Sequence, residues 1–365
     1  MYKVLILSVG YGDGHHAAAY AVRDEFQRRG CLCRVVDVCE AASPLLFSWT
    51  QAFYQLCVRR LPWLWGVAYA QTGTADWGKL LRYPGIWQAQ LLLKTLLDEE
   101  HPDVVICTYP LFAYMLDALG KNSGQPIPYA LIVTDSLEIS RPWMKSHTSL
   151  VCVPDEKSKQ IVCECYGLPD EVVVATGFPV KAEFETPTIR SIPTRGDCRI
   201  VYGTFAPTKR VCCDIRAIFK AMPEAKVTLI AGNRKARLEE LLSHELQLNN
   251  LNILSRTNEM HRLFAGNHVY IGKAGAATMF EAYASCIPVI VNYALPGQEQ
   301  GNLQLLLDDK AGMFVDSSDE LVSVLLRMLD NDAFQWRQMR SAMQRASRSG
   351  GAVHVANEVE RRFFL

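Results

Sequence analysis

The chain has 365 residues, more than one ordinary hydrophobic core holds, and this favours two domains of roughly 150–200 residues each. Its 38 Lys and Arg residues balance its 38 Asp and Glu residues, so no overall charge attracts it to nucleic acid and we expect no nucleic-acid partner. The longest uninterrupted apolar run, residues 61–70, is too short to span a bilayer.

Short β-branched runs alternate with helix-like segments along the first half of the chain. The predicted strands are residues 3–10, 34–38, 103–110, 129–135, 149–154 and 171–177. This order predicts a parallel sheet covered by helices. The first half of the chain, residues 1–185, is therefore expected to form one doubly wound α/β domain.

A stretch rich in Pro and Thr follows, and then the pattern restarts. We expect a linker over residues 186–197, a second doubly wound domain over 198–345 and a C-terminal helix over 346–365 that packs back on the first domain. The second set of strands is 199–205, 226–233, 251–255, 269–275, 288–294 and 312–316. Two such domains occur in dehydrogenases, in periplasmic-type binding proteins and in glycosyltransferases, so the fold class does not select a function.

Twelve cysteines occur mostly inside apolar runs, and no signal peptide precedes Met1. We therefore expect reduced thiols and a cytoplasmic location. The close cysteine pairs lack the C-x-x-C spacing of zinc and redox sites, and no D-x-D or His/Asp cluster is apparent, so no metal is expected. These pairs are Cys31/Cys33, Cys163/Cys165 and Cys212/Cys213.

The first strand leads into SVGYGDGHHAAAYAV, residues 8–22, which places two histidines behind three glycines at the start of a helix. Histidine stands where a dinucleotide fingerprint needs its third glycine, which disfavours NAD. We expect Gly10, Gly12 and Gly14 to let the backbone turn tightly enough to aim His15. The competing interpretation is that this turn holds a phosphate.

Residues 11–22, YGDGHHAAAYAV, resemble the acceptor-side loop of the diacylglycerol glycosyltransferases, which comprise the monogalactosyldiacylglycerol synthases and the processive diacylglycerol glucosyltransferases. Four further segments match in order: 107–112, 133–143, 176–184 and 271–302. The last is the most specific, with K-x-G-x-x-T-x-x-E-A followed by P-G-Q-E-x-x-N. More distantly, the chain is similar to the peptidoglycan GlcNAc transferase. The resemblance implies the α/β GT-B architecture, two Rossmann-like domains facing a central cleft.

The resemblance also implies an inverting enzyme that moves a hexose from UDP-glucose or UDP-galactose to diacylglycerol without a cofactor. Inverting transfer is one displacement, and it needs a base for the acceptor hydroxyl. By resemblance that base is His15, whose pKa a helix N-terminus is expected to lower. Asp135, at the end of a predicted strand, is the candidate to orient or replace it. Alternatively, His15 only shapes the loop or positions the acceptor.

The predicted donor site lies in the second half. Gly275, Ala276 and Thr278 open a helix whose amides can hold a pyrophosphate, and by resemblance Glu281 binds the ribose. The alternative is a plain strand-to-helix turn with a solvated glutamate. Further candidates are Gln298 and Glu299 for the sugar hydroxyls by resemblance, Asn302 for the sugar or as a helix cap, and the backbone around Arg256 and Asn258 for uracil.

Five of the seven tryptophans fall within residues 44–95, interleaved with basic residues. Aromatic and basic side chains together suit a membrane interface that holds anionic lipid, so we expect a peripheral protein on the inner face of the plasma membrane. The candidate contacts are Trp63, Trp65, Arg59 and Arg60. The alternative is that these aromatics fill a helical core, and the two interpretations are compatible if the tryptophans divide between core and rim.

The chain departs from the family pattern at Ser140, where a histidine is usual before Trp143, at Ala276, where glycine is usual, and after Gly203, where a glycine pair is missing. These departures bear on acceptor specificity and activity. The alternative functions are a UDP-GlcNAc-using transferase acting on a polyprenyl lipid, a UDP-sugar epimerase and a UDP-sugar-binding regulator with weak catalysis.

Overall fold

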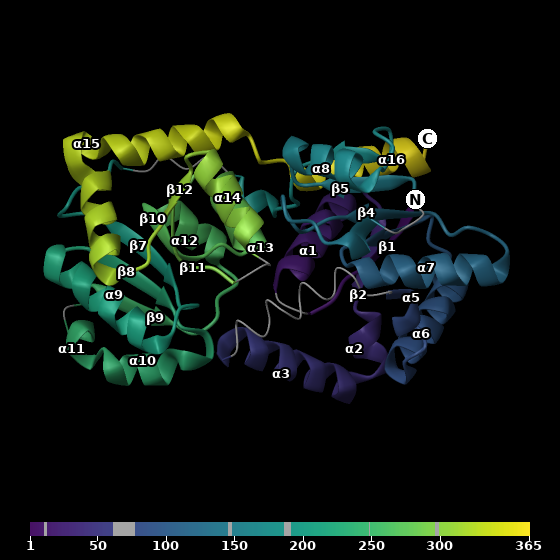
Figure 1. Ribbon diagram of the computed structural model, residues 1–365, viewed down its shortest axis with the longest axis horizontal. Helices are drawn as coiled ribbons and strands as arrows, with labels where there is room; N and C mark the ends of the chain where they lie inside the picture. Colours follow the sequence, from purple (N-terminus) through teal and green to yellow (C-terminus); the bar gives the residue numbers. More distant parts are fainter. Residues whose placement is uncertain (11–12, 61–76, 145–147, 186–190, 248, 296–298) are drawn as a thin grey trace. The chain divides into compact units, whose positions relative to one another are not determined.

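The computed structural model describes the chain except for residues 11–12, 61–76, 145–147, 186–190, 248 and 296–298 (Figure 1). It divides into two compact units. Unit 1 comprises Met1–Ala182, Leu295–Gly301 and Arg348–Leu365, and unit 2 comprises Glu183–Ala294 and Asn302–Ser347. Each unit is built around one six-stranded sheet.

The sheet of unit 1 has the strand order β2-β1-β3-β4-β5-β6, and every pairing is parallel. Its strands are β1 (Lys3–Leu7), β2 (Leu32–Val36), β3 (Val104–Cys107), β4 (Tyr129–Ile132), β5 (Leu150–Val153) and β6 (Val173–Ala175). The four central strands consist almost wholly of buried aliphatic residues. Parallel strands covered on both faces need such continuous apolar runs, which is why they were recognisable in the sequence.

Helices cover both faces of this sheet. One core joins β1, β3, β4 and β5 to α1 (Asp13–Arg28) and α16 (Gly351–Phe363). The other face carries α2 (Val38–Ala42), α3 (Pro44–Arg60), α5 (Trp77–Leu80), α6 (Pro84–Glu100), α7 (Pro110–Ser123), the 3-10 turn η1 (Arg141–Met144) and α8 (Glu156–Tyr166). Alternate residues of each strand face opposite cores, as in Leu5 and Ile6.

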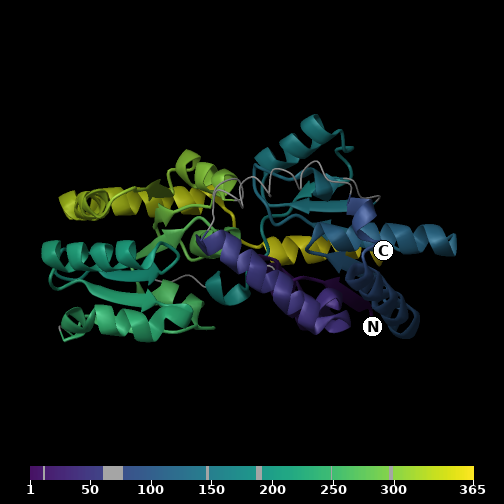
Figure 2. The same ribbon diagram turned by 60° about the horizontal axis from the view of Figure 1, so that its bottom comes forward.

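The C-terminal helix α16 belongs to unit 1, although the strands that precede it belong to unit 2. Val355, Ala356 and Val359 are fully buried in the core shared with α1. An ion pair of 2.8 Å between Arg29 and Glu360 joins the two helices. Figure 2 shows the yellow helix lying along the first unit beside the purple N-terminal elements.

The sheet of unit 2 has the order β12-β11-β10-β7-β8-β9, again all parallel. Its strands are β7 (Arg199–Gly203), β8 (Lys226–Ile230), β9 (Leu251–Leu254), β10 (Val269–Lys273), β11 (Val289–Tyr293) and β12 (Gly312–Phe314). The strand order reverses between β7 and β10. Ligands of open α/β sheets bind at the carboxyl ends of the strands beside such a reversal.

The helical elements of unit 2 are η3 (Gly232–Arg234), α9 (Thr208–Ala221), α10 (Lys235–Leu241), α11 (Ser243–Leu246), α12 (Met260–Gly266), α13 (Ala276–Ala284), α14 (Gln300–Asp308) and α15 (Ser318–Ala346); η2 (Ala182–Phe184) and α14 begin at the boundary between the units. The main core packs α9 and α15 against one face of the sheet. Backbone angles at Asp330–Ala333 are not helical, so α15 is two helices joined at a kink.

All twelve predicted strands are present, within a few residues of their predicted ends. The predicted linker lies partly outside the described residues, and Thr194 and Asp197 of its second half form an antiparallel bridge. All twelve cysteines lie in the described part of the chain and are free thiols. Within that part, no helix is both long and apolar enough to cross a membrane.

Candidate active site

His15 lies in the first turn of α1, where its ring is held by two residues from other strands. The Nδ1 atom lies 2.8 Å from the carbonyl oxygen of Thr108 and 2.9 Å from the hydroxyl of Thr134. A carbonyl only accepts hydrogen bonds, so Nδ1 must carry the proton. The lone pair of the ring is then on Nε2, which has no hydrogen bond within the described residues.

The surroundings of His15 keep its ring neutral. Burial lowers the pKa of His15 from its usual 6.5 to about 4, the bond to Thr108 opposes this shift, and the neighbouring His16 adds to it. The sequence predicted a lowered pKa, and the direction is confirmed. The main cause is loss of solvent around the ring, whereas the sequence argument named the helix N-terminus.

The glycine loop is fastened by side chains rather than by unusual glycine geometry. The amide of Gly10 donates to Asp37 Oδ2 at 3.0 Å, and its carbonyl accepts from Gln51 at 2.8 Å. His16 Nδ1 lies 2.8 Å from the buried hydroxyl of Ser8, which gives this second histidine a structural contact.

The glycine prediction is wrong at two of its three positions. Neither Gly10 nor Gly14 has a positive φ. A Cβ atom at Gly14 would meet no atom within 4 Å, and one at Gly10 would make contacts of 3.4 Å or more. The helix begins at Asp13, so Gly14 already has helical geometry that any residue can adopt. Gly12 lies outside the described residues.

Asp135 follows β4 at the carboxyl edge of the same sheet. Its Oδ2 atom accepts a hydrogen bond of 2.8 Å from Trp143 Nε1, and the carboxylate makes no other hydrogen bond within the described residues. Burial raises the pKa of Asp135 from 3.8 to about 6, against the lowering effect of the bond from Trp143. The Trp143 ring also lies 6.3 Å from the His15 ring, centre to centre, so the two candidates share a neighbour.

The loop that carries Asp135 is held in a strained backbone conformation. Leu137 has φ of 58°, in the left-handed region that side chains other than glycine disfavour. The hydroxyl of Ser136 donates to Asp155 Oδ2 at 3.0 Å, and the amide of Leu137 donates to Ser158 Oγ at 3.3 Å. The N-terminal turn of α8 therefore fixes this loop.

Sequence reasoning missed three residues that contact the two candidates: Thr108, Thr134 and Trp143. Thr108 follows β3, and Thr134 follows β4. A signal was available, because adjacent parallel strands end at one edge, and polar residues just beyond them meet there. The order of the strands in the sheet was needed to use it.

The predicted phosphate site is the start of α13 in unit 2. Gly275 is the N-cap with extended backbone, and no side chain caps the helix. The first amides, those of Ala276, Ala277 and Thr278, are not bonded within the helix, which leaves donors and the positive end of the helix dipole for an anion. Glu281 lies farther along α13 and is half-buried.

Asn302 does not lie at the helix-capping position that was one of its two predicted roles. Helix α14 begins at Gln300, so Asn302 lies inside its first turn, and the capping alternative is wrong. The side chain is 4% exposed and donates to the carbonyl of Ala274 at 3.1 Å, next to the N-cap Gly275. Its Oδ1 atom is buried without a hydrogen-bond partner in the described residues.

The other donor candidates are placed as follows. Glu299 is 3% exposed and accepts a hydrogen bond of 3.1 Å from the amide of Leu295, so this carboxylate closes its own loop. Gln298 lies outside the described residues. Arg256 and Asn258 follow β9, and both side chains are exposed.

The aromatic segment 44–95 divides between core and surface. Trp77 is 8% exposed and packs with Tyr109 in the main core of unit 1. Trp49 on α3 is 77% exposed and Trp87 on α6 is 53% exposed. Trp63 and Trp65 lie outside the described residues, as do the side chains of Arg59 and Arg60 at the end of α3.

A family model described as monogalactosyldiacylglycerol (MGDG) synthase matches residues 15–180. Two processive diacylglycerol beta-glucosyltransferases, from Bacillus mycoides and Bacillus cytotoxicus, are each 26% identical to the chain, and the matches cover 98% of this chain and 93% of each relative. Over nearly its whole length the chain is similar to diacylglycerol glycosyltransferases. The predicted resemblance is confirmed over nearly the whole length.

Solved structures show the GT-B fold predicted for a diacylglycerol glycosyltransferase. MurG of Acinetobacter baumannii aligns with a TM-score of 0.61 at 16% identity, over 99% of this chain and 100% of that one. UDP-GlcNAc 2-epimerase from Neisseria meningitidis aligns with a TM-score of 0.64 at 12% identity and the same coverage. At such identities the likeness shows the fold alone, which transferases and epimerases share.

The structure accommodates the departures from the diacylglycerol glycosyltransferase pattern at Ala276 and Ser140. Ala276 is the first helical residue of α13, where a methyl side chain causes no strain. The Ser140 carbonyl accepts the amide of Trp143 at 3.1 Å and so starts the turn that brings the indole to Asp135.

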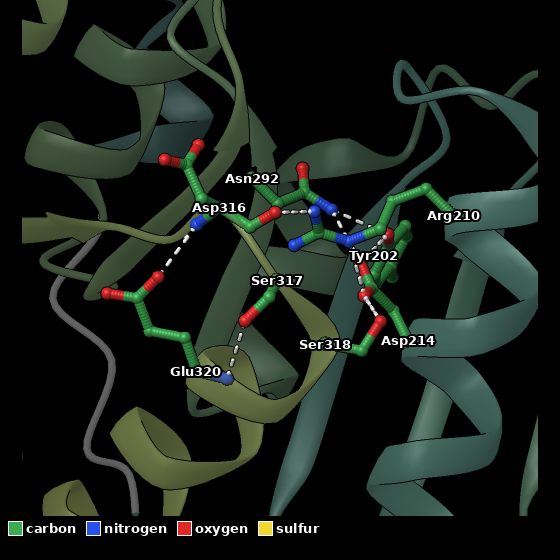
Figure 3. A network of polar contacts seen from close by, with 8 residues as sticks. All are labelled: Tyr202, Arg210, Asp214, Asn292, Asp316, Ser317, Ser318 and Glu320. Carbon is green, nitrogen blue, oxygen red and sulfur yellow. Dashed lines mark hydrogen bonds and ion pairs between the residues drawn. The ribbon is translucent and has the colours of Figure 1, made fainter.

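A buried polar network holds the carboxyl edge of the second sheet (Figure 3). Asp214 of α9 is fully buried and accepts four hydrogen bonds, from Tyr202 at 2.6 Å, Asn292 at 3.1 Å, Arg210 at 2.7 Å and Ser318 at 2.6 Å. The donors come from β7, β11, α9 and α15. One carboxylate therefore fastens two strands and two helices beside β10, the strand that leads into α13.

Proposed function

We propose that the chain is an inverting glycosyltransferase that moves a hexose from UDP-glucose or UDP-galactose to a diacylglycerol-type lipid. The observation that carries the proposal is the pairing of His15 and Asp135 around Trp143. Burial lowers the pKa of His15 and raises the pKa of Asp135. The Nε2 atom of His15 and the Oδ1 atom of Asp135 have no hydrogen-bond partner within the described residues, and both residues lie beside Trp143. Groups perturbed in this way are typical of active sites. The similarity to diacylglycerol glucosyltransferases supports the acceptor class.

The chemistry needs one proton acceptor. As the acceptor oxygen bonds to the anomeric carbon, its proton leaves, and the bond from that carbon to the UDP oxygen breaks with its electron pair. The pKa of about 6 at Asp135 matches a base working near neutrality better than the pKa of about 4 at His15. We therefore assign the proton of the acceptor hydroxyl to Asp135. His15 Nε2 can only accept a hydrogen bond, so we give His15 the role of shaping the acceptor site beside Trp143.

A pH profile of the single-turnover rate tests this assignment. If Asp135 is the base, the rate should rise with pH with a midpoint near 6, because only the carboxylate accepts a proton. If His15 is the base, as the sequence resemblance implies, the midpoint should lie near 4. A midpoint near 6 that persists in Asp135→Asn would contradict our assignment.

For the donor, the uncapped amides at the start of α13 support the diphosphate contact, and Glu281 on the same helix supports the ribose contact. The buried Oδ1 of Asn302 supports a third contact, because an unsatisfied buried acceptor is costly unless a ligand fills it. We propose that this site works without a metal. Turnover should then persist in EDTA; a loss that Mg²⁺ or Mn²⁺ restores would refute this point.

The outer surface of α3 supports contact with a lipid surface. Leu45, Trp49, Phe53 and Leu56 recur at helical spacing and are 80%, 77%, 66% and 47% exposed. We propose that this stripe, with the basic residues of segment 44–95, rests on the anionic inner face of the plasma membrane. Vesicle binding should grow with anionic lipid, weaken with salt and fall in Trp49→Ser/Phe53→Ser. Equal binding to neutral vesicles at all salt concentrations would contradict it.

The deciding experiment incubates the protein with a lipid extract of its host and a panel of labelled UDP-sugars. Label from UDP-glucose or UDP-galactose should appear in a diacylglycerol glycolipid. Label only from UDP-GlcNAc in a polyprenyl lipid favours the first alternative function. Epimerised UDP-sugar without vesicle binding favours an epimerase, and UDP-sugar binding without any product favours a regulator.

A further inference from the structure

An aromatic ring and a lysine meet at the point where the strand order of the second sheet reverses. Phe205 follows β7, and Lys273 is the last residue of the neighbouring β10. The Lys273 Nζ atom lies 5.0 Å from the centre of the Phe205 ring. Phe205 is 48% exposed, although it is a large apolar residue.

The strand ends beneath this pair are tightly packed. A Cβ atom at Gly203 would lie 2.7 Å from the Tyr270 hydroxyl, and one at Gly272 would lie 2.3 Å from it. The buried Tyr270 therefore fills the space that side chains at both glycines would occupy. This packing fixes the two strand ends, and with them the starting points of Phe205 and Lys273.

The loop after β7 is anchored from the opposite side. Both the amide and the hydroxyl of Thr204 donate to the carbonyl of Ile230, at 3.2 Å and 2.8 Å. Arg234 donates to the carbonyl of Ala206 at 2.9 Å. Phe205 thus sits between two bonded residues, and the ring is presented by a fixed backbone rather than by a loose loop.

Lys273 stands two residues before Gly275, the N-cap of α13, so its charge and the uncapped amides of that helix lie on one edge. A diphosphate needs such charge compensation, and the need grows as the bond to the anomeric carbon breaks and the electron pair passes to the phosphate oxygen. A cation held over an aromatic face stays close to the edge but keeps its charge available to a stronger anionic partner.

We propose that Lys273 contacts the diphosphate of the donor and stabilises the UDP leaving group, and that Phe205 is the residue that positions its ammonium. The proposal rests on the proposed UDP-sugar function and adds to it a cation and a positioning aromatic. No other reactant is required, since UDP leaves with the electron pair and the acceptor oxygen forms the new bond.

Calorimetry with UDP and with uridine tests the proposal, because only UDP carries the diphosphate. Lys273→Met should weaken UDP binding about tenfold or more, the loss expected for a charge-assisted contact, and leave uridine binding unchanged. Lys273→Arg should restore most of the UDP affinity. Lys235→Met, which removes the same charge from an exposed site in unit 2, should bind both ligands like the wild type.

The positioning role of Phe205 needs a double-mutant cycle. Phe205→Leu should weaken UDP binding severalfold in the wild-type background, keep uridine binding, and have no further effect in Lys273→Met. If Lys273→Met and Phe205→Leu fold cooperatively and bind UDP like the wild type, the proposal is overturned while the donor site stands. If the wild type binds neither UDP nor uridine, the proposed function fails as well.

Discussion

The two sheets end in polar edges that are built in opposite ways. In unit 2, Asp214 is fully buried and has four hydrogen-bond donors around it. In unit 1, Asp135 has one donor, Trp143, and the Nε2 atom of His15 has no partner within the described residues. The carboxylate of Asp214 is fully paired, although Arg210 Nη2 and Asn292 Oδ1 beside it are buried without a hydrogen-bond partner in the described residues. The carboxylate of Asp135 keeps capacity for a further ligand.

This difference distinguishes a carboxylate that stabilises the fold from a carboxylate that can take part in proton transfer. A satisfied buried carboxylate ties elements together, because removing any partner leaves an unpaired polar group in a low dielectric. An incompletely paired, desolvated carboxylate has a raised pKa and is ready to take a proton. The same fold and the same edge therefore serve two purposes, and mutations should separate them.

The largest effect should come from the incompletely paired edge. Asp135→Asn should lower the single-turnover rate by about 10²–10⁴, the usual range for loss of a general base. His15→Ala should also lower the rate, but less, because it removes a positioning residue and leaves the base in place. UDP-sugar affinity should change little, because both residues belong to unit 1 and the proposed donor contacts on α13 belong to unit 2. His16→Ala, which loses the contacts with the Ser8 hydroxyl and the Tyr20 ring, is the matched control and should affect the rate much less. Equal losses of the single-turnover rate in all three variants would contradict a specific role of His15 and Asp135 in the reaction.

The satisfied edge should respond in stability instead. The Asp214 side chain is 0% exposed and pairs with the largely buried Arg210. Asp214→Leu leaves the charge of Arg210 without its partner and should lower the free energy of unfolding by about 3–5 kcal/mol. Urea denaturation measures this change. Ser318→Ala removes one donor of the four and should cost less, about 1 kcal/mol. A stable Asp214→Leu protein with lost activity would show that this network is part of the site.

A smaller effect is expected at the donor helix. Glu281→Ala should lower UDP affinity roughly tenfold or more, because it removes charge-assisted hydrogen bonds to the ribose. Calorimetry measures the affinity, and uridine should be affected as strongly as UDP since both contain the ribose. Unchanged UDP binding in a folded variant would rule out the ribose contact.

The smallest effect is a pH dependence of stability with opposite signs at the two residues. The pKa of Asp135 is raised on folding, so its contribution to stability falls as pH rises from about 4 to 6. The pKa of His15 is lowered, so its contribution falls as pH falls from about 6.5 to 4. In the wild type the two contributions oppose each other.

Each single variant should expose the other residue's contribution. Asp135→Asn should lose stability as pH falls through that window, and His15→Ala should lose stability as pH rises through it, each relative to the wild type. The slope is at most about 1.4 kcal/mol per pH unit for one proton. Urea unfolding at several pH values measures it, and parallel curves for the two variants would show that neither residue is desolvated.

Much of the architecture was predictable because its signals are local. Most of the strands are short runs rich in apolar and β-branched residues, and such a run predicts a strand wherever that strand lies in the sheet. Residues 346–365 were predicted as a helix that packs on the first domain, and α16 packs its Val355 and Val359 in that core. The local signal gave a wrong prediction at Gly14. The glycine-rich stretch predicted a tight turn there, but α1 already begins at Asp13 and Gly14 has no positive φ.

The sequence by itself determined the two α/β sheets, the similarity to diacylglycerol glycosyltransferases and the identity of the titratable residues. The tertiary structure decided what those residues can do. Thr108, whose carbonyl sets the tautomer of His15, and Thr134, whose hydroxyl contacts the same ring nitrogen, lie 93 and 119 residues away along the chain. The pKa values of His15 and Asp135 follow from burial by segments distant in sequence, and desolvation is a property of the packed environment that no local pattern contains.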